Sequence, residues 1–104
     1  MATRTIIKQM EDFASQINLC GIDLKRVILY GSYANNTQTK YSDIDMALVA
    51  DDFSGVASED VKLFLKAMRK HYMVQAQTYN FKDFTADKDP FVEEILRTGI
   101  EIKA

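Results

Sequence analysis

The fold is decided by the stretch from Arg26 to Ala50, which has the sequence RVILYGSYANNTQTKYSDIDMALVA. It begins with a short apolar run over residues 26–30, which predicts a buried strand that ends at Gly31. It closes with residues 42–50, in which side chains of two kinds alternate. This alternation predicts a second strand, with one face formed by Ile44, Met46, Leu48 and Ala50 and the other by Asp43, Asp45, Ala47 and Val49.

The segments on either side of this stretch predict helices and a third strand. Apolar residues at helical spacing predict a helix over residues 5–19 that stops at Gly21. Ser58 predicts the N-cap of a second helix, because acidic residues follow it in the first turn. Its expected apolar face consists of Val61, Phe64, Leu65 and Met68. Residues 72–79 then predict the third strand.

The last quarter of the chain predicts one more helix. Asp89-Pro90 opens it with proline at the first helical position, and Gly99 closes it. We expect it to face the core through Phe91, Val92, Ile95 and Leu96. A terminal strand through Ile100 and Ile102 is an open alternative to simple packing. The order of elements predicts an α/β (α+β) fold, a small mixed sheet of three or four strands flanked by helices.

Length and composition limit the classes of protein that fit. The chain has 104 residues, so we expect residues 1–104 to form one domain. A net charge of −2 argues against a dedicated nucleic-acid-binding protein. No apolar run approaches the roughly 18 residues that a membrane helix needs, and we therefore expect a soluble cytoplasmic protein without a membrane segment.

Gly31 and Ser32 form the first half of a candidate binding site. A glycine at the end of a buried strand lets the backbone turn sharply and lets a ligand approach. Ser32 starts a predicted short helix over residues 33–36, and the N–H groups at a helix start suit phosphate. Taken alone, such a pair is more often an ordinary turn.

Asp43 and Asp45 form the second half. Residues i and i+2 of a strand point to the same side, with Cα atoms about 6.6 Å apart. Two carboxylates at this distance repel each other, and a divalent cation such as Mg2+ removes the repulsion. Taken alone, an Asp-x-Asp pair is more often a solvated strand face. The two halves together are more specific, because strand, turn, helix, loop and strand bring a phosphate site beside a metal site.

In these residues the sequence resembles a known family. The segments Leu29–Ala34 and Tyr41–Val49, LYGSYA and YSDIDMALV, are similar to the signature of the minimal nucleotidyltransferases, within the DNA polymerase β-type nucleotidyltransferase superfamily. The spacing of the two segments agrees without a gap. A looser likeness extends over nearly the whole chain, and it implies the nucleotidyltransferase fold.

The resemblance also implies a chemistry and a site. Gly31 and Ser32 would hold the β- and γ-phosphates of a nucleoside triphosphate, which we expect to be ATP, and Asp43 and Asp45 would bind Mg2+. Ser42 matches a small polar residue that orients the first carboxylate. The implied reaction transfers a nucleoside monophosphate to a hydroxyl of a protein or RNA acceptor and releases pyrophosphate.

Two departures from the family pattern bear on activity. Asn35-Asn36 stands where many relatives have Arg-Gly, so one phosphate-facing cation is missing. Active relatives usually carry a third acid on the strand that is here residues 72–79, where this chain offers Gln75 and Gln77. Gln75 is the first choice for the third catalytic position, with Gln77 on the same side of the strand.

Two function classes therefore remain open. The first is a Mg2+-dependent nucleotidyltransferase. The second is a catalytically weakened relative that acts as the antitoxin of a HEPN-type toxin, since relatives of this size often form toxin–antitoxin modules. The glutamines favour the second class, and the intact glycine, serine and aspartate set favours the first. Since these residues offer no base-recognition domain, we expect part of the nucleotide pocket to come from a partner protein or from a second copy in a homo-oligomer.

Three further residue types have ordinary interpretations. Cys20 is a lone cysteine, which we expect to be a small core residue. His71 follows three basic residues, and we expect a solvated helix cap. Tyr30, Tyr33 and Tyr41 flank the motif, and we expect them to pack beside the core, with stacking of one of them on a base as the alternative.

Overall fold

A four-stranded mixed sheet forms the centre of the computed structural model, which describes residues 4–39 and 42–102. The strands are β1 (Leu24–Tyr30), β2 (Ile44–Ala50), β3 (Val74–Tyr79) and β4 (Ile100–Ile102), in the spatial order β3-β2-β1-β4. β1 is antiparallel to β2 and β4, whereas β2 and β3 are parallel. The expected α/β fold with a small mixed sheet is confirmed, and β4 settles the alternative left open for the chain end.

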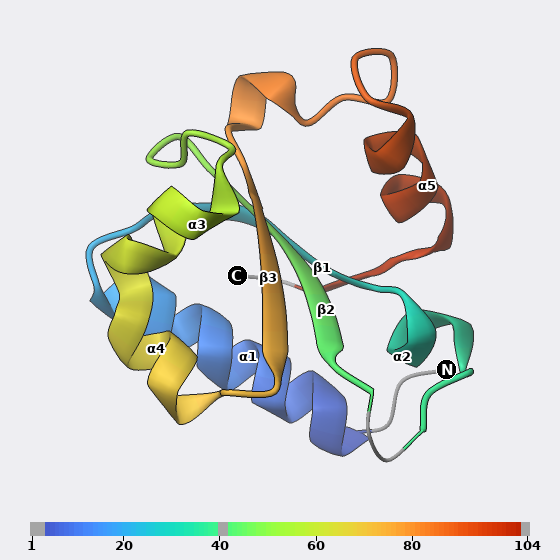
Figure 1. Cartoon of the computed structure of the whole chain (residues 1–104), viewed down its shortest axis with the longest axis horizontal. Helices are drawn as coiled ribbons and strands as arrows, with labels where there is room; N and C mark the ends of the chain where they lie inside the picture. Colours follow the sequence, from blue (N-terminus) through green and yellow to red (C-terminus); the bar gives the residue numbers. More distant parts are fainter. Residues whose placement is uncertain (1–3, 40–41, 103–104) are drawn as a thin grey trace.

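The helices cover the two faces of the sheet unequally (Figure 1). α1 (Arg4–Leu19) and the crossover between β2 and β3 lie on one face, and α5 (Pro90–Thr98) lies on the other. The crossover consists of α3 (Ala57–Asp60), the 3-10 turn η1 (Val61–Phe64) and α4 (Leu65–Lys70). The shorter elements are α2 (Ser32–Asn35) and the 3-10 turn η2 (Phe81–Asp83).

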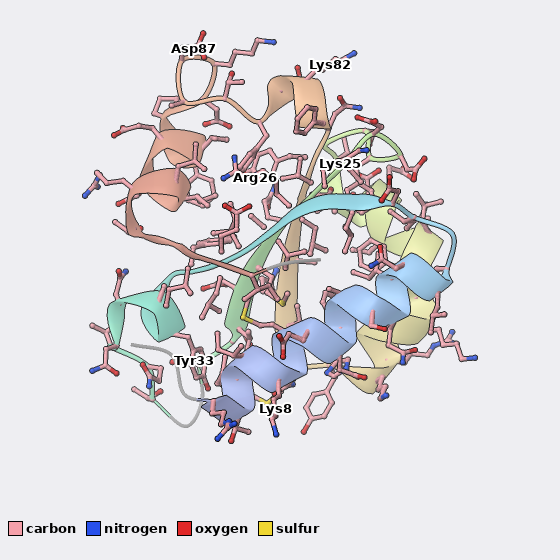
Figure 2. All side chains as sticks on the ribbon, turned by 180° about the vertical axis from the view of Figure 1, so that it is seen from behind. Lys8, Lys25, Arg26, Tyr33, Lys82 and Asp87 are labelled. Atoms are coloured by element: carbon pink, nitrogen blue, oxygen red, sulfur yellow. The ribbon has the colours of Figure 1, made fainter. Side chains whose placement is uncertain are left out.

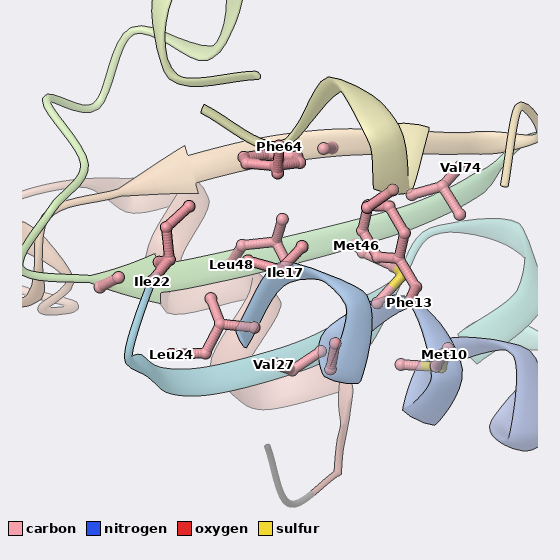
Figure 3. Packing of buried hydrophobic residues seen from close by; sticks show 14 of the residues in the cluster. Met10, Phe13, Ile17, Ile22, Leu24, Val27, Met46, Leu48, Phe64 and Val74 are labelled. Atoms are coloured by element: carbon pink, nitrogen blue, oxygen red, sulfur yellow. The ribbon is translucent and has the colours of Figure 1, made fainter. Parts of the chain in front are cut away.

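Alternation along the strands creates two separate cores. The larger core lies between the sheet and α1, and it takes Ile44, Met46, Leu48 and Ala50 from β2 (Figure 3). The smaller core lies under α5 and takes Ala47 and Val49 from the opposite face of β2. The predicted alternation of β2 is therefore confirmed, and it places Asp45 on the α5 side of the sheet.

The crossover differs from the single helix that the sequence predicts. Its N-cap is Val56, so the expectation of a Ser58 cap was wrong. The 3-10 turn interrupts the helical period, and Phe64 and Ala67 are buried while Leu65 is 44% exposed. A tighter turn advances each residue by a larger angle than an α-helix does, which rotates the later residues off the expected face.

Asp60 explains why the crossover has this shape. Its carboxylate is 4% exposed and accepts hydrogen bonds from the Ser54 hydroxyl (2.9 Å), the Gly55 N–H (3.0 Å) and the Thr78 hydroxyl (2.6 Å). The Ser54 N–H donates a further bond of 2.9 Å. Burial alone would raise the pKa of Asp60, but these hydrogen bonds outweigh it and lower the pKa below its usual value. Asp60 thereby ties the loop before α3 to β3.

We expect Asp60→Asn to lower the free energy of unfolding by about 2 kcal/mol at pH 7, because an amide nitrogen leaves buried donors without an acceptor. A depressed pKa in the folded state means that this stability is present above the unfolded value of about 4 and is lost as pH falls through the folded pKa. Urea denaturation should show that the difference in free energy of unfolding between wild type and Asp60→Asn is smaller at pH 3 than at pH 7. Glu59→Gln, at an exposed neighbour, is the matched control and should change stability little. Equal effects of the two variants would contradict this role.

Two further expectations about single residues were wrong. Cys20 is exposed, because it lies in the turn after α1 and not within the helix. His71 is 8% exposed, and its Nε2 lies 2.6 Å from Oδ2 of Asp12 while its ring packs edge-on against Phe13. His71 is the C-cap residue of α4, as expected, but it is buried and joins α4 to α1 instead of lying in solvent.

The last helix begins and packs largely as predicted. Asp89 caps it by accepting a hydrogen bond from the Phe91 N–H at 2.9 Å, and Val92 and Ile95 are buried. Phe91 is 45% exposed and Leu96 is 38% exposed, so both contribute less to the core than expected. Among the described residues, no helix has the length and apolar character needed to cross a bilayer.

Candidate functional site

The turn after β1 is built around Gly31. This residue has φ 74° and ψ −149°, a conformation that glycine adopts readily and other residues rarely do. Its carbonyl accepts hydrogen bonds from the N–H groups of Ala34 (3.1 Å) and Asn35 (3.0 Å), so α2 starts directly at Ser32. The chain thus leaves a buried strand and enters a short helix within one residue.

Asp45 lies against this turn. Its Cα is paired with that of Tyr30 across β1 and β2, one residue before Gly31. A Cβ added to Gly31 would overlap Oδ2 of Asp45 and lie 3.2 Å from its Cγ. The structure therefore brings the Asp45 carboxylate beside the Gly31-Ser32 turn, although the two segments are separated by a loop in the sequence.

Asp43 and Asp45 influence each other electrostatically. Asp45 is half-buried, and burial raises the pKa of its carboxyl above the usual value, with a further increase from the negative charge of Asp43. Asp43 is exposed and precedes β2, which begins at Ile44 and not at Ser42 as predicted. The pair concentrates negative charge at one point, and a bound cation would relieve the repulsion.

Gln75 is aligned with Asp45 in the sheet. The parallel pairing of β2 and β3 matches the Cα of Asp45 with that of Gln75, and the Cα of Ala47 with that of Gln77. The nearest strand position to Asp45 on β3 therefore carries an amide. Within residues 4–39 and 42–102, no three acidic, histidine or cysteine side chains come together in a group able to hold a metal ion.

Ser42 stabilises the loop that leads to the aspartates. Its hydroxyl accepts a hydrogen bond from the Thr39 N–H at 2.8 Å, and its own N–H donates to the Thr39 carbonyl at 3.1 Å. These contacts fix the approach to Asp43 through the backbone.

The two asparagines that depart from the family pattern have different consequences. Asn36 takes φ 59° at the end of α2, a left-handed conformation that asparagine tolerates better than most residues. Asparagine therefore meets the backbone requirement that glycine would meet there. Asn35 is exposed and uncharged, so this position supplies no cation toward the turn.

Comparison with known proteins identifies the family to which this arrangement belongs. A family model described as polymerase beta, nucleotidyltransferase matches residues 9–104. The chain belongs to this family. The fold and the suspected relationship to nucleotidyltransferases are thereby confirmed.

One sequence relative of this nucleotidyltransferase comes from Methanocaldococcus jannaschii and is named for a proposed protein adenylyltransferase activity. It is 48% identical over 44 residues, which are 41% of this chain and 44% of that protein. The chain thus matches less than half the length of this relative.

Two solved structures are similar in fold. A crystal structure of a toxin–antitoxin with AMP-PNP has a TM-score of 0.59 and 21% identity, and the match covers 88% of this chain and 70% of that one. A crystal structure of a toxin–antitoxin MntA-HpeT mutant, with two Asp-to-Glu substitutions two positions apart, has a TM-score of 0.51 and 20% identity. That match covers 93% of this chain and 68% of the other.

A pocket of about 210 Å3 opens on the α5 side of the Gly31 turn. Tyr30, Gly31 and Asn35 line one wall, and Phe91, Glu94 and Thr98 of α5 line the other. This pocket was not predicted from the sequence. Phe91 was expected to face the core, but it is 45% exposed and lines the pocket.

The three tyrosines near the motif now have different surroundings. Tyr30 lines the pocket, and burial, assisted by the charge of Asp45, raises the pKa of its phenol to about 12. Tyr33 packs against the core under α1 and is labelled in Figure 2. Tyr41 lies outside the described residues. Of the two described tyrosines, Tyr30 is the one placed to meet a ligand.

Proposed function

We propose that this chain binds a nucleoside triphosphate, ATP in the first instance, together with Mg2+ at the Gly31-Ser32 turn and the Asp43/Asp45 pair. The observation that carries this proposal is the contact of Asp45 with Gly31, which puts a carboxylate beside the turn expected to hold phosphate. Family membership supports it, as do the AMP-PNP named for one fold neighbour and the adenylyltransferase activity named for the sequence relative.

The donor set fits magnesium. Asp43 and Asp45 provide carboxylate oxygens, and Gln75 provides an amide oxygen on the neighbouring strand position. Magnesium prefers such oxygen ligands and usually completes its shell with water and substrate phosphates. When bound, it would neutralise charge on the triphosphate and lower the pKa of an attacking hydroxyl.

The proposed reaction uses the protein mainly for positioning. The backbone N–H groups and hydroxyl at Ser32 would hold the phosphates beside Gly31, where the absence of a side chain permits close approach. An acceptor hydroxyl on a protein or RNA would give up its proton to solvent and form a bond to the α-phosphorus. The bond between the α-phosphorus and the bridging oxygen breaks, and pyrophosphate leaves. We propose that residues 1–104 carry this function as one nucleotidyltransferase domain.

Mg-ATP should stabilise the wild-type chain against heat, by about 2.7 kcal/mol at one hundred times the dissociation constant. The double variant Asp43→Asn/Asp45→Asn should lose this stabilisation, because the amides remove both charges that hold the cation. The matched control is Asp51→Asn/Asp52→Asn, which removes two exposed charges immediately after β2. Differential scanning calorimetry with and without Mg-ATP measures the effect.

The Asp51→Asn/Asp52→Asn control distinguishes the loss of a specific metal site from a general effect of removing two negative charges. It should retain the wild-type stabilisation by Mg-ATP. A wild type that Mg-ATP does not stabilise, or a site variant that it stabilises equally, would contradict the proposed nucleotide site.

A second candidate function is partner binding as an antitoxin of a HEPN-type toxin. Both fold neighbours are toxin–antitoxin structures, and the β3 position aligned with Asp45, where the resemblance leads us to expect a third acid, carries the amide of Gln75. Co-expression with the product of the adjacent gene, followed by gel filtration, tests this function. Separate elution of the two proteins at micromolar concentration would exclude a stable complex of this kind.

A further inference from the structure

We propose that the pocket between α5 and the Gly31 turn holds the nucleoside part of the nucleotide and selects a base that carries an exocyclic amino group, as adenine does. This inference rests on the proposed nucleotide site and adds the element that distinguishes one triphosphate from another. The residues that carry it are Tyr30, Asn35, Phe91, Glu94 and Thr98.

The position of the pocket connects it to the phosphate site. Gly31 forms part of its wall and is also the residue against which Asp45 packs. A ligand whose phosphates lie at Gly31 would therefore extend directly into the pocket. At about 210 Å3 the pocket is smaller than sites that enclose a whole drug-sized ligand, so it fits one part of a nucleotide.

The charge of the pocket shows which part of the nucleotide it suits. Among the described residues, Glu94 is the one acidic residue in its wall, and a carboxylate repels the phosphate groups. The part of the chain that the structure describes adds no lysine, arginine or histidine to this lining. The triphosphate is thus favoured beside Ser32 and the metal pair, and the uncharged base and sugar are favoured in the pocket.

Two aromatic rings give the pocket a stacking surface. Tyr30 and Phe91 pack edge to face, with ring centroids 5.6 Å apart and planes at 89°. Phe91 remains 45% exposed, so its ring is not enclosed by the core. Stacking on an exposed aromatic ring increases the affinity of a nucleotide whichever base it carries.

The polar groups supply the selectivity. The Thr98 hydroxyl donates its hydrogen to the Glu94 carbonyl at 2.8 Å, which leaves its oxygen free to accept from a ligand. The Glu94 carboxylate lies 3.8 Å from the Arg97 guanidinium, a long contact between two exposed side chains. Acceptors therefore predominate, and Asn35 can either donate or accept. An exocyclic amino group on the base can donate hydrogen bonds to these acceptors.

Titration calorimetry of the full chain with three magnesium-loaded ligands tests the inference: ATP, purine riboside triphosphate (which lacks the 6-amino group) and tripolyphosphate. We expect wild type to bind ATP about tenfold more tightly than purine riboside triphosphate, since one hydrogen bond to a charged acceptor is lost. Glu94→Ala should abolish this tenfold difference and should not weaken tripolyphosphate. Phe91→Ala should weaken both nucleotides about tenfold and leave tripolyphosphate unchanged.

Glu93→Ala is the matched control for Glu94→Ala. Glu93 lies one position earlier on α5, contacts the same Arg97 at 3.8 Å and does not line the pocket. It should retain the preference for ATP. Equal preferences in the Glu93→Ala and Glu94→Ala variants, or equal affinity of wild type for ATP and tripolyphosphate, would overturn the nucleoside pocket and leave the phosphate site standing. Failure of all three ligands to bind would overturn both proposals.

Discussion

Gly31→Ala should abolish Mg-ATP binding and also destabilise the fold by about 1–3 kcal/mol, the cost of a non-glycine residue in a strained positive-φ conformation. Two physical effects act together at this position. The backbone has φ 74°, and a methyl group would overlap the Asp45 carboxylate. Relief of the overlap must displace either the turn or Asp45, and each displacement separates the proposed phosphate site from the proposed metal site.

Gly55→Ala separates the two effects. Gly55 has φ 96°, and a Cβ built there would meet no atom within 4 Å. It should therefore show the loss of stability from backbone strain and retain Mg-ATP binding. Chemical denaturation and titration calorimetry on both variants measure the two quantities independently. If Gly31→Ala bound Mg-ATP as tightly as Gly55→Ala, the contact between Gly31 and Asp45 would have no function in binding.

The sheet could be predicted from the sequence because its signal is local. The alternation in β2 assigns each side chain to one face, and the structure places Met46 and Leu48 in one core and Ala47 and Val49 in the other. A shift of one residue would reverse every assignment, so the register is strongly specified. The expectation that Asp43 and Asp45 lie beside the Gly31 turn had a different basis, the order strand, turn, helix, loop and strand that joins the two segments.

Features that depend on tertiary contacts could not be predicted in the same way. Asp60 follows a good capping serine in the sequence, yet its carboxylate is buried by partners on β3 and in the preceding loop. His71 is buried where α4 packs against α1, with its ring against Phe13 and its Nε2 2.6 Å from Asp12 Oδ2. The pocket at Gly31 joins residues of β1 and α5 that no sequence spacing relates. Each case requires knowledge of which distant segments come together.

The alignment of Gln75 with Asp45 leads to the second large effect. Gln75→Glu should raise the rate of nucleotide transfer by about tenfold or more, which corresponds to roughly 1.4 kcal/mol of activation free energy. The replacement retains an oxygen beside Asp45 and adds a full negative charge. That charge should favour the cation that activates the acceptor hydroxyl more than the cation that arrives with the triphosphate. ATP affinity should therefore remain within a few-fold of wild type.

Gln77→Glu is the matched control, because it introduces the same charge on the same strand at the position aligned with Ala47. Position 77 is displaced from Asp45 both across the sheet and by about 6.6 Å along the strand, whereas position 75 is displaced across the sheet alone, so a carboxylate at position 77 lies farther from the cation that Asp45 would hold. The measurement is transfer of label from α-labelled Mg-ATP to the purified product of the adjacent gene. Wild type should transfer slowly, Gln75→Glu faster and Gln77→Glu little faster than wild type. Rapid transfer by the wild type would show that the third carboxylate is dispensable or supplied by the acceptor, and the importance assigned to Gln75 would then be wrong.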